Sequence, residues 1–118
     1  MGKRDGGNRV TKQELSKLLH RLNIPVNEGV TSPENFNRLP RIVYWAYLWE
    51  DRTSSGTDYD TVTTYQISFY ADRPAHSKLL ELREYLREAG LHPMISHEYS
   101  IEDKIWHSYF ALEVTENE

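Results

Sequence analysis

Histidine is the residue type in this chain best suited to metal binding or to proton transfer near neutral pH. The chain has five histidines: His20, His76, His92, His97 and His107. No two of them stand four residues apart on a predicted helix, and the sequence contains no HExxH motif. His92 and His97 are five residues apart on a predicted strand, so they would point to opposite faces. We therefore expect solvated or edge histidines, with a metal-dependent hydrolase kept as an alternative.

Carboxylates gather in the polar segment 50–60, which joins two predicted strands. They are Glu50, Asp51, Asp58 and Asp60. Such a cluster could supply a general acid and base or ligands for a cation, but its spacing differs from an EF-hand loop. Ser55 of this segment lies outside a GxSxG frame, and the sequence contains neither GxxxxGK[ST] nor GxGxxG. We interpret the segment as a solvated hairpin loop and predict no enzyme, no metal and no cofactor.

The strand pattern is clearest at residues 61–71, where mostly apolar and mostly polar residues alternate. β-branched and aromatic residues fill this segment, as suits a pleated surface. A strong partner strand is predicted upstream at 41–49, and another downstream at 104–114. Weaker strand patterns lie at 91–99 and, as a short edge strand with a proline, at 24–26. Since strands usually pair with their sequence neighbours, the predicted sheet is mainly antiparallel.

Two helices are predicted beside this sheet. Thr11 and Glu14 have the spacing of a capping box, and four leucines follow in one stripe. The stripe consists of Leu15, Leu18, Leu19 and Leu22. The second helix is expected to begin near Pro74, to carry a stripe from Leu79 to Leu86 and to end at Gly90. We therefore predict an α+β fold of order α-β-β-β-α-β-β, with two helices packed on one face of the sheet.

The bulk composition fits one small domain. The chain has 118 residues, no cysteine and a net charge of −4. We expect a flexible arm at 1–10, a single α+β domain at 11–115 and a frayed end at 116–118. The charge gives no basic footprint for nucleic acid or membrane, and no apolar run is long enough for a membrane span. We therefore expect no membrane partner and a protein made in a cytoplasm.

The aromatic content is the feature that bears most directly on function. Both alternating faces of segment 41–49 are apolar, with Ile42, Tyr44 and Leu48 on one and Val43, Trp45, Tyr47 and Trp49 on the other. The sequence leaves open which face is the core. Because helices cover one side of a two-layer domain, the remaining apolar residues predict a protein interface. Our candidates for that interface are Trp45, Tyr47, Trp49, Asp51, Ser55, Asp58, Tyr59, Tyr70, Trp106 and Tyr109.

Four segments carry a resemblance to a known family. Residues 23–26 resemble a "GIPV" turn, and 40–44 match a "P-x-I-V-Y" strand. Residues 65–72 are similar to "Y-Q-I-x-L-Y-x-D", and 86–90 end a leucine-rich helix in Ala-Gly. In this order the segments resemble small phage proteins of the head–tail junction, known as tail completion, tail terminator or head–tail joining proteins. The pattern covers about residues 11–115; it departs from the family at Asn23, where glycine is common, and in the long polar segment 27–37.

The resemblance implies a non-enzymatic protein of the virion neck, assembled in the host cytoplasm. Such a protein forms a ring, commonly a hexamer, that completes the tail and joins it to the head. Its implied partners are copies of itself, the tail tube protein and the head completion or connector protein, with DNA only passing through the lumen. The residues themselves leave two alternatives: a small-molecule-binding regulatory domain with a pocket between helix and sheet, and the hydrolase mentioned above.

Overall fold

The structure is a computed structural model that describes the backbone of residues 9–53 and 59–115 and the side chains of 10–53 and 61–115. Its elements are β1 (Arg9–Thr11), α1 (Lys12–His20), β2 (Val26–Glu28), the 3₁₀ turn η1 (Pro33–Asn35), β3 (Arg41–Thr53), β4 (Tyr59–Ala71), α2 (Ser77–Glu88), β5 (Ser96–Ser100) and β6 (Ile105–Thr115). Most of the expected arm and the frayed C-terminus lie outside the described residues. Arg9 and Val10, which were expected in the arm, instead form β1.

The sheet has six strands in the order β1-β6-β4-β3-β2, with β5 also paired to β6. β3, β4, β5 and β6 pair antiparallel, as expected, whereas β1 runs parallel to β6 and β2 parallel to β3. The class is therefore α+β with a mixed sheet. The prediction of a mainly antiparallel sheet missed both parallel edges, because strands of three residues are too short to show alternation. Segment 29–40 supplies the crossover that a parallel β2–β3 pair requires.

Local sequence patterns determine both helices. The backbone N–H of Glu14 donates to Thr11 Oγ1 at 3.1 Å, and Glu14 Oε1 accepts from the Thr11 N–H at 3.0 Å, which confirms the capping box. α2 begins later than expected: His76 is its N-cap, and its ring accepts from the Lys78 N–H, while Pro74 precedes the helix. At the other end Gly90 has a φ of 77°, a conformation that suits glycine after a helix.

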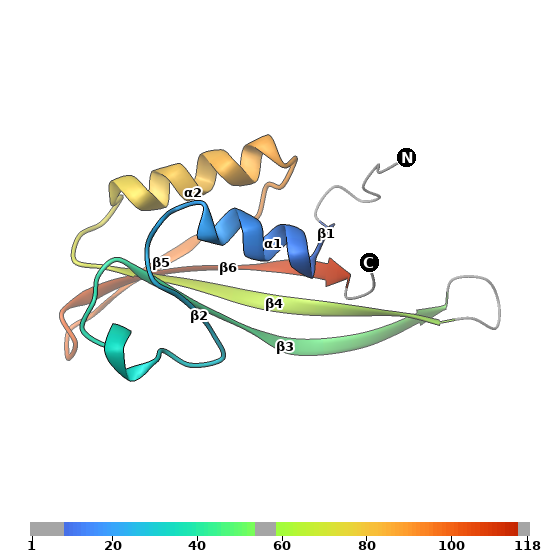
Figure 1. Cartoon of the computed structure of the whole chain (residues 1–118), viewed down its shortest axis with the longest axis horizontal. Coiled ribbons are helices and arrows are strands. Elements are labelled where there is room, and N and C mark those ends of the chain that lie inside the picture. The colour runs from blue at the N-terminus through green and yellow to red at the C-terminus, as the bar shows by residue number, and fades with distance from the viewer. Residues whose placement is uncertain (1–8, 54–58, 116–118) are drawn as a thin grey trace.

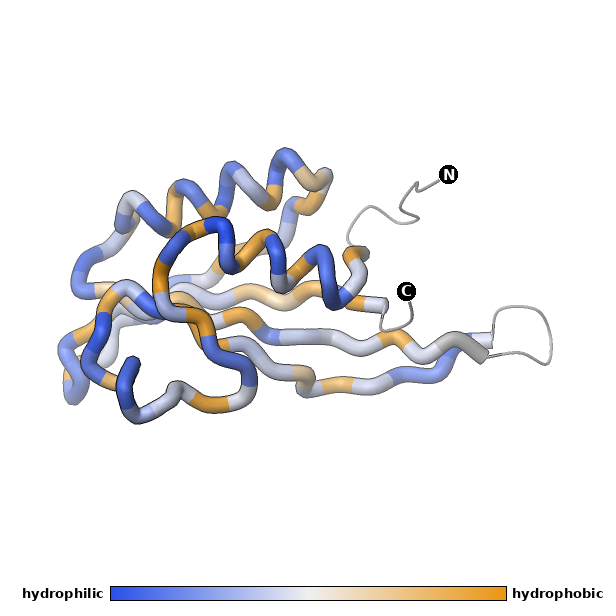
Figure 2. The backbone as a smooth tube through the Cα atoms, in the orientation of Figure 1, coloured by the Kyte–Doolittle hydropathy of each residue, from blue (hydrophilic) through white to orange (hydrophobic). Residues whose placement is uncertain are grey.

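Both helices lie over the same face of the sheet (Figure 1). Hydrophobic and hydrophilic segments alternate along each of them (Figure 2), and the predicted leucines are buried. The core lies between the helices and the sheet and includes Leu15, Leu19, Leu82, Leu86, Ile42, Tyr44, Tyr65, Ile67, Phe69, Phe110, Leu112 and Val114. Ile42 and Tyr44 therefore form the core face of β3, and Val43 and Trp45 lie on the face opposite to α1 and α2, called here the helix-free face.

A β-bulge at Tyr47 interrupts the alternation of β3. Ala46 pairs with Tyr65 and Leu48 with Thr64, so Tyr47 is an extra residue without a partner in this ladder. Trp49 then pairs with Thr63 and lies on the helix side of the sheet, opposite to Trp45. The predicted grouping of Trp45, Tyr47 and Trp49 on one face is therefore wrong, because strict alternation does not survive a bulge.

The β3–β4 hairpin extends well beyond the helices and makes the molecule long, with extents of 50 × 26 × 23 Å (Figure 1). Its strands have 13 residues each, which is long for a small domain. Within the described segments, neither helix is long and apolar enough to cross a membrane.

Candidate functional site

A row of four polar and aromatic side chains crosses the helix-free face. The strand register aligns Arg41 of β3, Tyr70 of β4, His107 of β6 and Glu98 of β5. The Arg41 guanidinium lies 4.9 Å from the centre of the Tyr70 ring, and that ring stacks on His107 at 4.6 Å with an angle of 13°. Cation–π and stacking contacts therefore link β3, β4 and β6 in this row, and Tyr109 extends it at 4.7 Å from His107.

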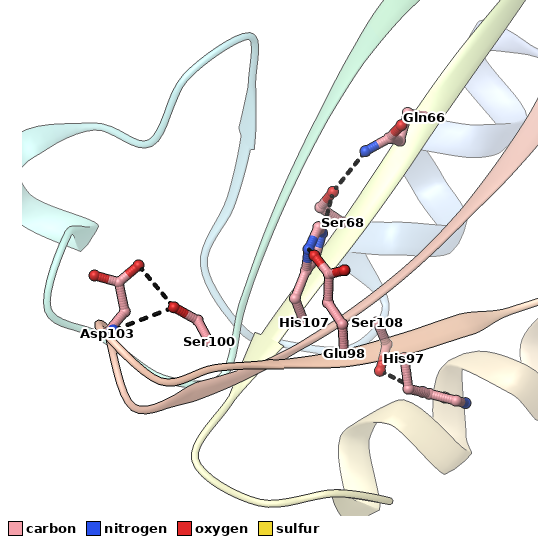
Figure 3. Close-up of polar contacts among 8 residues, drawn as sticks. All are labelled: Gln66, Ser68, His97, Glu98, Ser100, Asp103, His107 and Ser108. Carbon is pink, nitrogen blue, oxygen red and sulfur yellow. Dashed lines mark hydrogen bonds and ion pairs between the residues drawn. The ribbon is translucent and has the colours of Figure 1, made fainter.

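A chain of hydrogen bonds runs through the same residues (Figure 3). Gln66 Nε2 donates to Ser68 Oγ at 3.2 Å, and Ser68 Oγ lies 2.8 Å from His107 Nε2. His107 Nδ1 lies 3.3 Å from a carboxylate oxygen of Glu98. One pattern satisfies every group: His107 carries its proton on Nδ1 and donates to Glu98, and the Ser68 hydroxyl donates to Nε2.

Ser68, His107 and Glu98 thus have the connectivity of a serine–histidine–carboxylate triad. The arrangement lacks the access that a nucleophile needs, because Ser68 is fully buried. β4 is also paired on both sides along this stretch, so its backbone N–H groups are engaged in the sheet and do not form an oxyanion hole. In the described conformation this chain of hydrogen bonds ties β4, β5 and β6 together.

The outer half of the hairpin exposes large apolar side chains. The exposed fractions are 55% for Tyr47, 48% for Leu48 and 77% for Trp49. Trp49 lies beside Asp51 on the helix side of the hairpin, where they line a shallow hollow with Ala46, Thr63 and Tyr65. Asp51 accepts a hydrogen bond from the Thr61 hydroxyl at 3.0 Å. This surface combines an exposed indole with a carboxylate two residues further along β3.

An ion-pair bridge stiffens the opposite side of the same hairpin. Arg52 lies 2.9 Å from Glu50 and 3.0 Å from Glu113 of β6. Because β4 lies between β3 and β6, the Arg52–Glu113 pair spans β4 on the helix-free face, where Val62 is buried. The bridge couples the projecting hairpin to the last strand.

A cavity of about 630 Å³ lies between α2 and the β5–β6 pair. Its walls are formed mainly by Pro74, Ala75, Leu79, Leu80, Pro93, Ile95 and Trp106, together with Arg83, His97 and Ser108. His97 Nδ1 lies 2.7 Å from Ser108 Oγ, which fixes the imidazole at the wall (Figure 3). Arg83 makes no ion pair with any residue that the structure describes. The cavity is therefore apolar with one available cation.

Burial and charge shift two pKa values near α1. Lys12 Nζ lies 3.0 Å from Glu28 of β2, and this hydrogen bond is the main reason that the pKa of Lys12 is raised above its ordinary range. Burial raises the pKa of Tyr44, and the nearby Glu28 carboxylate adds to the effect. The Lys12–Glu28 pair joins α1 to the edge strand. Its position indicates a structural contact, because it lies away from the row and the cavity.

The predicted interface residues that the structure describes fall in four separate places. Trp45, Tyr70 and Tyr109 lie half-buried on the helix-free face, and Trp49 and Asp51 lie on the helix side of the hairpin. Trp106 lies under α2 at the cavity. Tyr47 lies at the bulge. Ser55 and Asp58 lie outside the described residues, as does the side chain of Tyr59.

Sequence reasoning missed the residues that connect these places. His107 was expected to be solvated or at an edge, but it lies in β6 between β4 and β5, with 17% of its side chain exposed. His92 was expected on one strand with His97, pointing to the opposite face, but β5 begins at Ser96, so His92 lies outside the strand and that prediction is wrong. The alternation of segment 104–114 could have placed His107 on the face of Tyr109. No local signal pointed to Ser68 or Arg83.

Within the described part of the chain, no three histidine, aspartate or glutamate side chains gather in a way that could hold a metal ion. The geometry therefore offers no particular support for the hydrolase alternative. In the comparisons with known proteins, no family model matches the chain, and neither does any curated protein.

Proposed function

We propose that this chain is a non-enzymatic structural protein of a tailed-phage neck, which forms a ring that completes the tail and joins it to the head. The observation that carries the proposal is the projecting β3–β4 hairpin. Tyr47, Leu48 and Trp49 are exposed there, and Leu48 and Trp49 pair with Thr64 and Thr63 of β4, far along that strand from Ala71, which pairs with Trp106 of the cavity. Large apolar side chains gathered on a projecting element are typical of a protein interface.

Ring assembly requires two different surfaces on each subunit, since each subunit contacts its two neighbours through different patches. The hairpin and the cavity under α2 are two such surfaces, and the helix-free face offers a third for the tail tube or the head connector. The resemblance of residues 23–26, 40–44, 65–72 and 86–90 to tail completion and tail terminator proteins supports the same function.

Deleting the gene from the phage or prophage that encodes it tests the proposal. We expect electron micrographs to show heads and tails that have not joined, or tails whose ends are abnormal. Supplying the wild-type gene should restore normal particles. Antibody labelling of complemented particles should mark the head–tail junction. Joined, infectious particles without the gene product would contradict the proposal.

A second function, small-molecule binding, is favoured by the cavity alone. Its volume of about 630 Å³ falls in the usual range for ligand pockets, and Trp106, Arg83 and His97 give it an aromatic wall and polar groups. A regulatory ligand would raise the melting temperature of the isolated protein by mass action. A thermal-shift screen of planar acids therefore separates the two functions, because the neck function predicts that no such ligand raises the melting temperature.

A further inference from the structure

The hairpin carries an aromatic residue and an acid that its own chain leaves uncovered. Trp49 and Asp51 are two residues apart and lie on the same side of β3, opposite Thr63 and Thr61. Trp49 is 77% exposed, and Asp51 makes no ion pair with any described residue. The hollow beside them is also lined by Glu28, whose carboxylate pairs with Lys12 at the start of α1. An indole and a carboxylate at this spacing form a compact recognition feature.

The cavity under α2 has the complementary chemistry. Its walls are apolar around Trp106 and Leu79, and Arg83 is its charged residue, with no carboxylate in the lining. A smaller hollow of about 140 Å³ adjoins it, shares Arg83 and adds Arg87, which is itself paired with Glu84 at 2.9 Å. The adjoining hollows thus join an apolar floor to a rim at which Arg83 offers its guanidinium, which fits an apolar side chain followed by an acid.

The two features cannot meet within one chain. Trp49 lies opposite Thr63 of β4, whereas Trp106 of the cavity lies opposite Ala71 of the same strand, eight residues or about 26 Å further along. A contact between them must therefore join two copies head to tail. Such a contact is heterologous, and it closes into a ring when the rotation between copies allows.

We propose that Trp49 of one copy inserts into the cavity under α2 of the next copy and that Asp51 pairs there with Arg83. This inference rests on the proposed ring function and identifies the contact that builds the ring. The cavity has room for an indole. Burial of a tryptophan in such a pocket, with a charge pair at its edge, is the usual composition of an interface hot spot.

Sedimentation of the purified full chain over a range of concentrations tests the contact. We expect the wild type to self-associate and Trp49→Ala to remain monomeric while melting at the wild-type temperature, because the side chain is exposed. Asp51→Arg and Arg83→Asp should each weaken association by about tenfold or more, and the double variant should recover most of the loss. Arg38→Asp reverses a charge on an exposed loop residue that lines neither the cavity nor the hollow beside Trp49, and it should associate as the wild type does.

A head-to-tail contact also predicts a result for mixtures. Trp49→Ala retains a working cavity, and Leu80→Glu, at the exposed rim of the cavity, retains a working hairpin. Each variant alone should be monomeric. Their mixture should form one-to-one dimers and nothing larger, because the two remaining surfaces are both blocked.

Three outcomes would overturn the inference. The first is a wild type that stays monomeric up to about 1 mM. The second is self-association that survives both Trp49→Ala and Arg83→Asp. The third is a double charge variant that associates no more strongly than either single variant. Association that is lost in Trp45→Ala and kept in Trp49→Ala would place the ring contact on the helix-free face and leave the neck function standing. Association as proposed, with normal particles assembled in the absence of the gene, would instead refute the neck function and keep the contact.

Discussion

Tyr44 and Trp45 are neighbours in β3 whose side chains lie on opposite faces of the sheet. Tyr44 is buried in the core against Tyr65, with the ring centres 5.8 Å apart, and Trp45 is half-buried on the helix-free face. We predict that Tyr44→Ala lowers the free energy of unfolding by about 3 kcal/mol or more. Trp45→Ala should cost about 1–2 kcal/mol, because less of its surface is withdrawn from water. Urea unfolding measures both values, and equal losses would show that Trp45 is covered as fully as Tyr44.

Tyr44 also predicts a pH dependence. Because burial raises its pKa in the folded chain, the unfolded chain loses this proton first as the pH rises past about 10. The unfolded state then binds fewer protons than the folded state, so stability falls with rising pH. The contribution of the neutral phenol is complete below that pH and is lost as the pH approaches the folded pKa.

The matched variant for this prediction is Tyr44→Phe, which keeps the ring and removes the titrating group. We expect the fall in unfolding free energy between about pH 8 and pH 11 to be smaller in Tyr44→Phe than in the wild type. All other titratable groups are the same in the two proteins, so their contributions cancel in the comparison. Identical pH profiles would show that Tyr44 titrates alike in the folded and unfolded chains.

At the scale of the element, the capping box of α1 makes a clear prediction. The Thr11 hydroxyl accepts the Glu14 N–H at the start of a helix whose leucines form part of the core. Thr11→Ala should lower the free energy of unfolding by about 1 kcal/mol, whereas Thr11→Ser should keep most of it, because serine caps equally well. Chemical unfolding of the two variants compares them directly. Similar losses in both would point to the threonine methyl group instead of the cap.

At the scale of the whole molecule, β1 pairs with β6, a strand at the other end of the sequence. Arg9, Val10 and Thr11 pair with residues 113–115 of β6, and Val10 is 3% exposed in the core. Deletion of residues 1–8 should therefore leave the melting temperature nearly unchanged. Deletion of 1–11 should cost about 3 kcal/mol, since it removes a buried valine and the helix cap. Differential scanning calorimetry of both truncated chains checks this, and a large loss from the shorter deletion would contradict it.

The sequence by itself determined the features that depend on interactions between residues close together in the chain. The capping box, the leucine stripes and Gly90 define both helices within a few residues, because caps and 3.6-residue periodicity involve near neighbours. The alternation in 61–71 and 104–114 likewise predicted β4 and β6, and with them the α+β class. The two-helix layer on one face of the sheet followed from the same patterns.

The tertiary structure decided the features that depend on register and on distant pairing. β1 and β2 have only three residues, so their parallel partners become visible in the folded sheet alone. The bulge at Tyr47 is a local change of pairing that places Trp49 on the opposite face to Trp45, and no residue type in this segment predicts it. The chain Gln66–Ser68–His107–Glu98 joins three strands, and the cavity beside Arg83 joins α2 to β5 and β6. Contacts of this kind form only when segments far apart in the sequence are aligned in the fold. The local sequence around each residue therefore does not predict them.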